Sequence, residues 1–180
     1  MTSSWNKNRT ILGSLDYFTE TLGRTISWLN LMLVFMVCLV VILRYVLNIG
    51  SIAMQESAMY LHAIIFLGAS GYTLKQDDHV RVDVFYRNMS PKKQALINSL
   101  GTLFLLTPVC LFIGIMSWEY IVSSWSIRET SNDPGGLPFI YLLKSLLLVM
   151  VVSLLLQGFA ELLRSVMIIK GIDQKVDTHG

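Results

Sequence analysis

The sequence predicts an all-α membrane protein whose chain crosses the bilayer four times. Only 14% of its 180 residues are charged and 53% are hydrophobic, whereas a soluble domain carries about 25% charged residues. Four apolar stretches reach the roughly 20 residues that a helix needs to cross a hydrocarbon core of about 30 Å. We therefore expect a single membrane domain over residues 1–180, and no nucleic-acid partner.

The first three predicted spans cover residues 27–47, 53–74 and 95–117. The centre of the first span carries no charge, the second has Glu56 near its start, and the third has Pro108 in its middle. The fourth span, residues 137–169, would be about 50 Å long as a helix. It must therefore tilt, bend or extend into water before the tail that residues 170–180 form.

An amphipathic helix is expected before the first span, over residues 10–24. Its apolar residues fall on one narrow stripe at helical spacing: Ile11, Leu15, Phe18, Leu22 and Ile26. Asp16, Glu20 and Arg24 fall on the opposite face. This pattern is typical of a helix that lies along the membrane surface, although a disordered leader or a helix that docks a partner would fit the same residues.

The distribution of lysine and arginine predicts the orientation. Eleven of these residues lie before the first span, between the second and third spans, or late in the fourth span and after it. The opposite side has only Arg44, near the end of the first span, and Arg128, while Lys144 lies within the fourth span. Positively charged loops stay in the cytoplasm. Both termini are therefore expected inside, with the loops around Asn48 and Asn132 outside.

Three charged residues near the outer ends of the spans are candidate sites, because an ionisable residue within a span is costly unless it has a role. Arg44 is expected to reach the headgroups, contact a lipid phosphate or pair with Glu56. Glu56 either caps its own helix or pairs with Arg44 or Lys144. Lys144 could instead reach the outer interface, and Glu119 is expected to be exposed.

The centres of the spans offer no cluster of polar ligands. His62 alone approaches that depth, and it is expected to be a packed residue. The two cysteines, Cys38 and Cys110, lie in apolar runs rather than in loops, and the three histidines are not paired as haem ligands would be. We expect no catalytic residue, cofactor or metal site, and a chain poorly equipped to carry a polar solute alone.

Several short motifs follow one another in a specific order: Arg44-Tyr45-Val46-Leu47-Asn48, Gln55-Glu56, Phe66-Leu67-Gly68-Ala69, His79-Val80-Arg81-Val82-Asp83 and Pro91. Later motifs continue this order: Ser124-Trp125, Glu129-Thr130-Ser131, Gly135-Gly136-Leu137-Pro138 and Leu143-Lys144. Between Ile26 and Leu163 the chain thus resembles the small membrane (permease) subunit of tripartite ATP-independent periplasmic (TRAP) transporters. It departs from the pattern at Ala53-Met54-Gln55-Glu56, where the family often has Trp-x-Glu-Glu, and at Tyr141, where tryptophan is common.

The resemblance implies a multi-pass protein of a bacterial inner membrane and a division of labour among three proteins. A periplasmic solute-binding protein captures an organic anion, typically a carboxylate. A large multi-span subunit holds the solute and sodium sites and moves as an elevator, and the small subunit supports its fixed scaffold. Candidate contacts with that subunit or with lipid are Arg44, Glu56, Lys144, His79 and Arg81.

Two other interpretations remain open from the sequence. The chain could be an autonomous four-helix carrier coupled to protons, with Glu56 as its proton site. It could also be a membrane subunit that takes no part in transport, such as an assembly factor or a subunit of a membrane enzyme.

Overall fold

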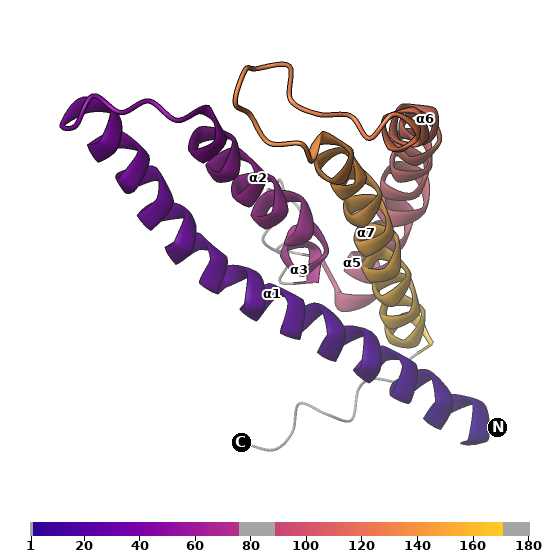
Figure 1. The fold of residues 1–180 in the computed structure, drawn as a ribbon. Helices are drawn as coiled ribbons and strands as arrows, with labels where there is room; N and C mark the ends of the chain where they lie inside the picture. The colour runs from indigo at the N-terminus through magenta and orange to yellow at the C-terminus, as the bar shows by residue number, and fades with distance from the viewer. Residues whose placement is uncertain (1, 76–88, 171–180) are drawn as a thin grey trace.

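The computed structural model describes residues 2–75 and 89–170 (Figure 1). Within these ranges the regular elements are all helical: α1 Thr2–Tyr45, α2 Ile52–Gly68, α3 Ser70–Lys75, α5 Pro91–Gly101, the π-helical segment η1 Thr102–Leu106, α6 Thr107–Ser126 and α7 Ile140–Ile169. Four stretches are long and apolar enough to cross a membrane: Thr25–Tyr45, Ile52–Lys75, Pro91–Ser126 and Ile140–Ile169. The predicted all-α fold with four spans is confirmed.

Two spans differ in their bounds from the sequence prediction. The third helical stretch starts at Pro91 and continues to Ser126, beyond the predicted 95–117, because Ile121 and Ser124 in its last turns are buried. The fourth helix begins at Ile140 rather than at residue 137. The backbone N–H of Leu137 donates to a side chain of α2, so this residue belongs to the preceding loop.

Helix α1 runs without interruption through the segment in which a separate surface helix was expected. It contains no proline, and the hydroxyls of Thr21, Thr25 and Ser27 each donate to a carbonyl four residues earlier at 2.8 Å. Residues 10–24 are therefore helical but joined directly to the first span. Of the predicted apolar stripe, only the Ile26 side chain is described, and it is buried. A position along the membrane surface stays a prediction.

The two ends of the bundle are distinct. The start of α1 and the end of α7 lie at the same end (Figure 1), which we call the terminal end. The connections 46–51 and 127–139 lie at the opposite end, which we call the loop end. An even number of crossings requires this arrangement, while the assignment of the terminal end to the cytoplasm stays a prediction from the positive charges.

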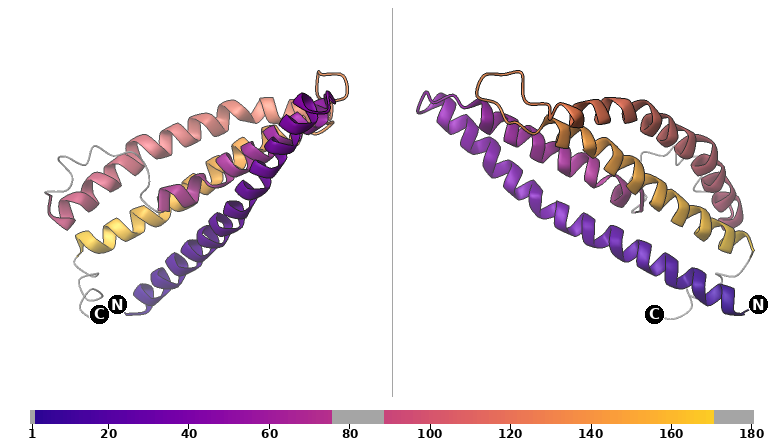
Figure 2. Two further views of the ribbon diagram at one scale, coloured as in Figure 1. Left: turned by 90° about the vertical axis from the view of Figure 1, so that its left-hand side faces the viewer. Right: turned by 45° about the vertical axis from the view of Figure 1, so that its right-hand side comes forward.

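Helix α7 is the centre of the bundle. It contacts α1, α2, α3, α5 and α6, and Figure 2 shows α2 and α7 between α1 on one side and α5–α6 on the other. Its buried residues include small and polar ones: Val151, Gln157, Gly158, Ala160 and Ser165. Small residues let helices approach closely in a membrane, where lipid provides no hydrophobic drive for their association.

Close contact between α3 and α7 depends on Gly71. A Cβ at this position would lie 3.0 Å from the carbonyl oxygen of Ser153 in α7. Beside it, the hydroxyls of Ser70 and Ser153 are hydrogen-bonded at 3.1 Å. The predicted use of small residues for packing within the chain is thus seen at this crossing.

The third span bends at a π-helical segment. Pro108 has no backbone N–H, so it cannot continue the regular helical bonds. Just before it, the N–H and the hydroxyl of Thr107 both donate to the carbonyl of Thr102, five residues earlier. Figure 2 shows the resulting arc of α5, η1 and α6 against the straighter α7.

We predict that Gly71→Ala lowers the free energy of unfolding of the detergent-purified chain by about 1 kcal/mol or more, because overpacking a filled site usually costs about 1–3 kcal/mol. Gly101→Ala is the matched control, since nothing lies within 4 Å of its added Cβ. The control should keep or gain stability, because alanine favours helix over glycine by up to about 1 kcal/mol. Titration with a denaturing detergent, followed by circular dichroism, measures both. Equal stabilities would contradict the tight α3–α7 crossing.

Candidate functional site

The loop 127–139 is held against α2 by the carboxylate of Glu56. One carboxylate oxygen accepts the backbone N–H of Leu137 at 2.5 Å, and the other accepts the hydroxyl of Ser131. Ser131 also accepts the N–H of Asp133 at 3.1 Å and donates its own N–H to the carbonyl of Leu137 at 3.1 Å. A single acidic side chain thus ties the loop together and fixes it to the start of the second span.

Gly136 gives the Glu56 carboxylate room to reach the loop. A Cβ at this position would lie 2.4 Å from the Ser131 hydroxyl oxygen and 2.7 Å from a Glu56 carboxylate oxygen. Real side chains do not approach so closely, so any other residue would displace Glu56 or Ser131. The glycine and the acid therefore act as one structural unit.

A second polar contact joins the end of α6 to the start of α7. The Lys144 ammonium pairs with the Glu129 carboxylate and lies 3.8 Å from the centre of the Tyr120 ring. The side chains of Lys144 and Glu129 are 13% and 28% exposed. Partial burial strengthens both the ion pair and the cation–π contact. The amine of Lys144 is thus satisfied within the chain.

Aromatic side chains extend this contact. The indole N–H of Trp125 donates to the Ser145 hydroxyl at 2.8 Å. The Trp125 and Tyr141 rings meet edge to face with their centres 4.8 Å apart. Such pairs contribute about 0.5–1.5 kcal/mol beyond the area that they bury. Together with the ion pair, these aromatic contacts fix the angle between α6 and α7.

The ion pair lowers the pKa of Glu129, which lies outside the membrane-spanning helices. The hydrogen bond from Lys144 is the largest cause, and the positive charge of Lys144 acts in the same direction. Burial opposes these effects without reversing them. Glu129 therefore stays ionised to a lower pH than an ordinary glutamate.

The structure corrects the expected partners of the sequence-predicted charges. A pairing of Glu56 with Arg44 or Lys144 is wrong: among the described residues, Ser131 and Leu137 bind Glu56 and Glu129 binds Lys144. The reason is that the loop 127–139 folds back over α2 and brings its own donors to the carboxylate. Sequence reasoning missed Glu129 as a partner, although it is one of the two acidic residues of that loop.

Arg44 and Glu119 are exposed. The Arg44 guanidinium lies 6.0 Å from the centre of the neighbouring Tyr45 ring, in the last turn of α1, where the helix dipole favours a cation. His62 is exposed rather than packed, and its ring stacks on Phe66. His79 and Arg81 lie outside the described residues.

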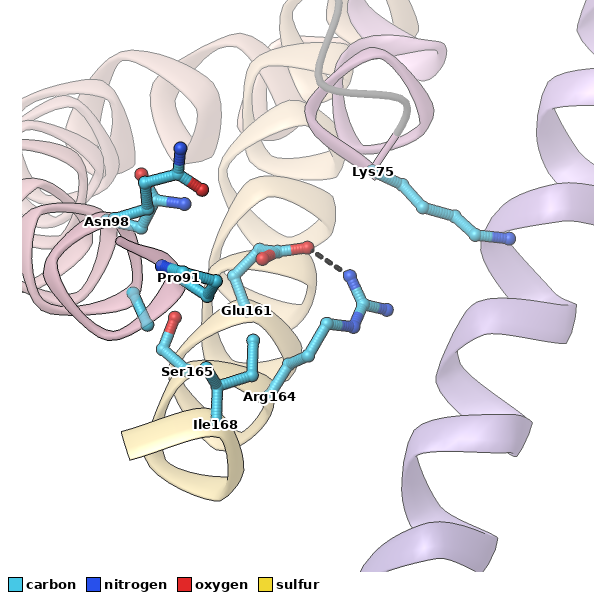
Figure 3. A pocket seen from close by; sticks show the side chains of 9 residues that line it. Lys75, Pro91, Asn98, Glu161, Arg164, Ser165 and Ile168 are labelled. Carbon is cyan, nitrogen blue, oxygen red and sulfur yellow. Dashed lines mark hydrogen bonds and ion pairs between the residues drawn. The ribbon is translucent and has the colours of Figure 1, made fainter. Parts of the chain in front are cut away.

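A third polar cluster lies at the terminal end. Lys75 pairs with Glu20 at 2.8 Å, and Arg164 pairs with Glu161 at 2.5 Å. A cavity of about 290 Å³ between α3, α5 and α7 is lined by Lys75, Pro91, Gln94, Ala95, Asn98, Glu161, Arg164, Ser165 and Ile168 (Figure 3). Lys75 and Pro91 also flank the segment that carries His79 and Arg81. Polar chemistry therefore gathers at both ends of the bundle.

In the part of the chain that the structure describes, no group of three or more histidine, cysteine or acidic residues is placed to hold a metal ion.

A family model, described as the DctQ component of tripartite ATP-independent periplasmic transporters, matches residues 33–167. The chain belongs to this family. The match begins within the first span and ends in the last turn of α7, so it includes part of the first span and reaches through the other three spans of this DctQ-family protein. Comparisons with curated proteins and with solved structures gave no match.

We predict that Glu56→Gln loosens the loop 127–139. An amide has one acceptor oxygen where the carboxylate has two, so either Leu137 or Ser131 loses its bond. A lost bond to a charged group is worth about 1.5–3 kcal/mol, and 1.4 kcal/mol corresponds to about tenfold. Trypsin should therefore cleave the purified variant after the exposed Arg128 about ten times faster. Glu119→Gln makes the same chemical change at an exposed site and should leave the rate unchanged, and equal rates for both variants would contradict the clamp.

The lowered pKa of Glu129 predicts a pH-dependent stability. Its contribution is fully present above the ordinary pKa near 4.5 and is lost as the pH falls through the lower folded-state pKa. Thermal unfolding measured from pH 7 downward should show wild type losing more stability below about pH 4.5 than Glu129→Gln, which cannot titrate. Parallel curves for the two proteins would refute this role of the ion pair.

Proposed function

We propose that the chain is the small membrane subunit of a sodium-coupled, binding-protein-dependent transporter of organic anions, with carboxylates as the solute class. In this proposal it is a scaffold for the large transport subunit, in a bacterial inner membrane. The terminal end faces the cytoplasm and the loop end faces the periplasm. Membership in the DctQ family supports the transporter assignment.

The placement of the polar groups is the observation that carries the scaffold role. Within the described residues, the ion pairs lie at the two ends, at Glu129–Lys144 on one side and at Glu20–Lys75 and Glu161–Arg164 on the other. A carrier needs ligands near the midplane, often on broken helices. Ser70 and Ser153, which lie deeper in the bundle, bond to each other across a helix crossing. These groups hold helices together rather than line a solute path.

The surface of the bundle also favours a supporting role. Helix α6 and the part of α1 from Trp28 onward turn large apolar side chains outward, among them Phe35 at 69% and Phe112 at 63% exposed. Such side chains need a cover of lipid or of another membrane protein. A protein that presents two broad apolar faces on either side of helices packed against α7 is suited to hold a partner in place.

The autonomous proton carrier finds less support. Its proton site would be Glu56, which lies in the second turn of α2 at the loop end and is bound by Leu137 and Ser131. A carboxylate that fixes a loop is poorly suited to exchange protons with both sides of a membrane. A non-transport role is disfavoured by the family to which the chain belongs.

Reconstitution tests the proposal. The chain is coexpressed with the large membrane subunit and the periplasmic binding protein from the same organism, and thermal shifts of the periplasmic protein against a panel of carboxylates identify the solute. We expect uptake of that carboxylate into proteoliposomes only with all three proteins and an inward sodium gradient, without ATP. Uptake by this chain alone, or full uptake when it is left out, would overturn the scaffold role.

A further inference from the structure

Helix α6 has one face toward α7 and an opposite face that nothing in the described chain covers. Cys110, Ile121 and Ser124 are buried against the bundle. Phe112, Ile115, Glu119 and Val122 are exposed, and at 100° per residue they cluster on the far side of the helix. This outward face is broadly apolar and carries one carboxylate.

A groove of about 590 Å³ lies beside that carboxylate. Its lining residues are Gly114, Ile115, Met116, Trp118 and Glu119. Gly114 with Trp118, and Ile115 with Glu119, form two neighbouring rows with a spacing of four residues. Packed helices place their own ridges between such rows. Gly114 borders the groove on the bundle side, where a Cβ would lie 3.4 Å from the Val151 side chain of α7. Its shape therefore suits another transmembrane helix.

Glu119 lies at the depth of groups that are paired. The next residue, Tyr120, holds the Lys144 ammonium 3.8 Å from its ring centre, so Glu119 is level with the first turns of α7. It is seven residues before the end of α6, or about 10 Å along the axis. Within the described part of the chain, the Glu119 side chain forms no hydrogen bond or ion pair. A charge in a span normally pairs with another group.

The outward face of α1 provides a contrast within the same molecule. It carries a groove of the same volume, about 590 Å³, lined by Trp28, Leu31, Met32, Val34, Phe35 and Cys38. None of these lining residues is charged. Helices α1 and α6 lie on opposite sides of the bundle (Figure 2). The wholly apolar α1 face suits lipid tails, whereas the α6 face calls for a partner that supplies a cation.

We propose that the outward face of α6 around Glu119 is the surface on which the large membrane subunit docks, with a lysine or arginine of that subunit paired to the Glu119 carboxylate. The inference rests on the proposed function, which supplies the partner. Beyond the proposed function, it specifies that the partner is recognised by the outward face of α6 and by the negative charge of Glu119. The partner helix places its ridge in the groove beside Trp118, and its cation meets Glu119 at the loop end.

Site-specific crosslinking in the intact complex tests the assignment. A photo-crosslinking amino acid replaces Ile115 on α6 or Phe35 on α1, which are 66% and 69% exposed, and the chain is coexpressed with the large membrane subunit. We expect position 115 to crosslink to that subunit and position 35 to crosslink to lipid. Crosslinking of the subunit from position 35 instead, or only lipid at position 115, would overturn the proposal.

Charge variants test the recognition itself. Glu119→Lys should lower the amount of large subunit that copurifies with the chain at least about tenfold, because opposing like charges at an interface is strongly unfavourable. Glu119→Gln should lower it less. Val46→Lys, which introduces the same residue at a 69% exposed position just after α1 at the loop end, is the control that should keep the yield. A matching circular dichroism spectrum establishes that each variant is folded. Failure of the wild-type chain to copurify would refute the proposed function, whereas copurification unaffected by Glu119→Lys would refute only the α6 surface.

Discussion

The packing of every other span against α7 is the contact on which the rest of the structure depends. Helices in a membrane gain little from hydrophobic burial against one another, so close approach and polar bonds must hold them. Helix α7 supplies both, through Gly158 and Ala160 on its buried side and through Ser153, whose hydroxyl bonds to Ser70 of α3. The outer helices can then keep their apolar faces turned away from the bundle.

The loop end is fixed by charges that a bilayer would resist if they stood alone. Glu56 binds the loop that connects α6 to α7, and Lys144 binds Glu129 at the start of the same loop. Each charge is satisfied by a group that reaches it only when the loop is folded. The cost of leaving a charge unpaired thus becomes a constraint on the loop, and through Trp125 and Tyr141 on the angle between α6 and α7.

The sequence predicted the class of fold and the spans because apolar length is a local property that a bilayer dictates. It could not predict the partners of Glu56 and Lys144. Those depend on how thirteen loop residues, 127–139, fold back, and neither hydrophobic periodicity nor residue spacing carries that information. The continuous α1 was missed for a related reason. The amphipathic segment 10–24 and the apolar span that follows it have different patterns and were predicted as two helices, but no helix-breaking residue separates them. The family resemblance, by contrast, did draw attention to the Glu129 and Gly135–Leu137 motifs.

The position of Glu119 follows from the same rule that explains the paired charges. Glu56, Lys144 and Glu129 each meet a partner inside the chain, and all of them lie on surfaces that face the loop or the bundle. Glu119 has a comparable depth but faces outward from α6. The contacts that fix α6 against α7 therefore also fix the direction in which this carboxylate points. A charge on the exterior face of a span costs free energy in lipid alone and contributes binding free energy only when another protein brings the opposite charge. The cost of an unpaired charge in a span thus has two consequences. The Glu129–Lys144 ion pair sets the angle between α6 and α7, and the outward Glu119 carboxylate determines which face of the bundle a partner can occupy.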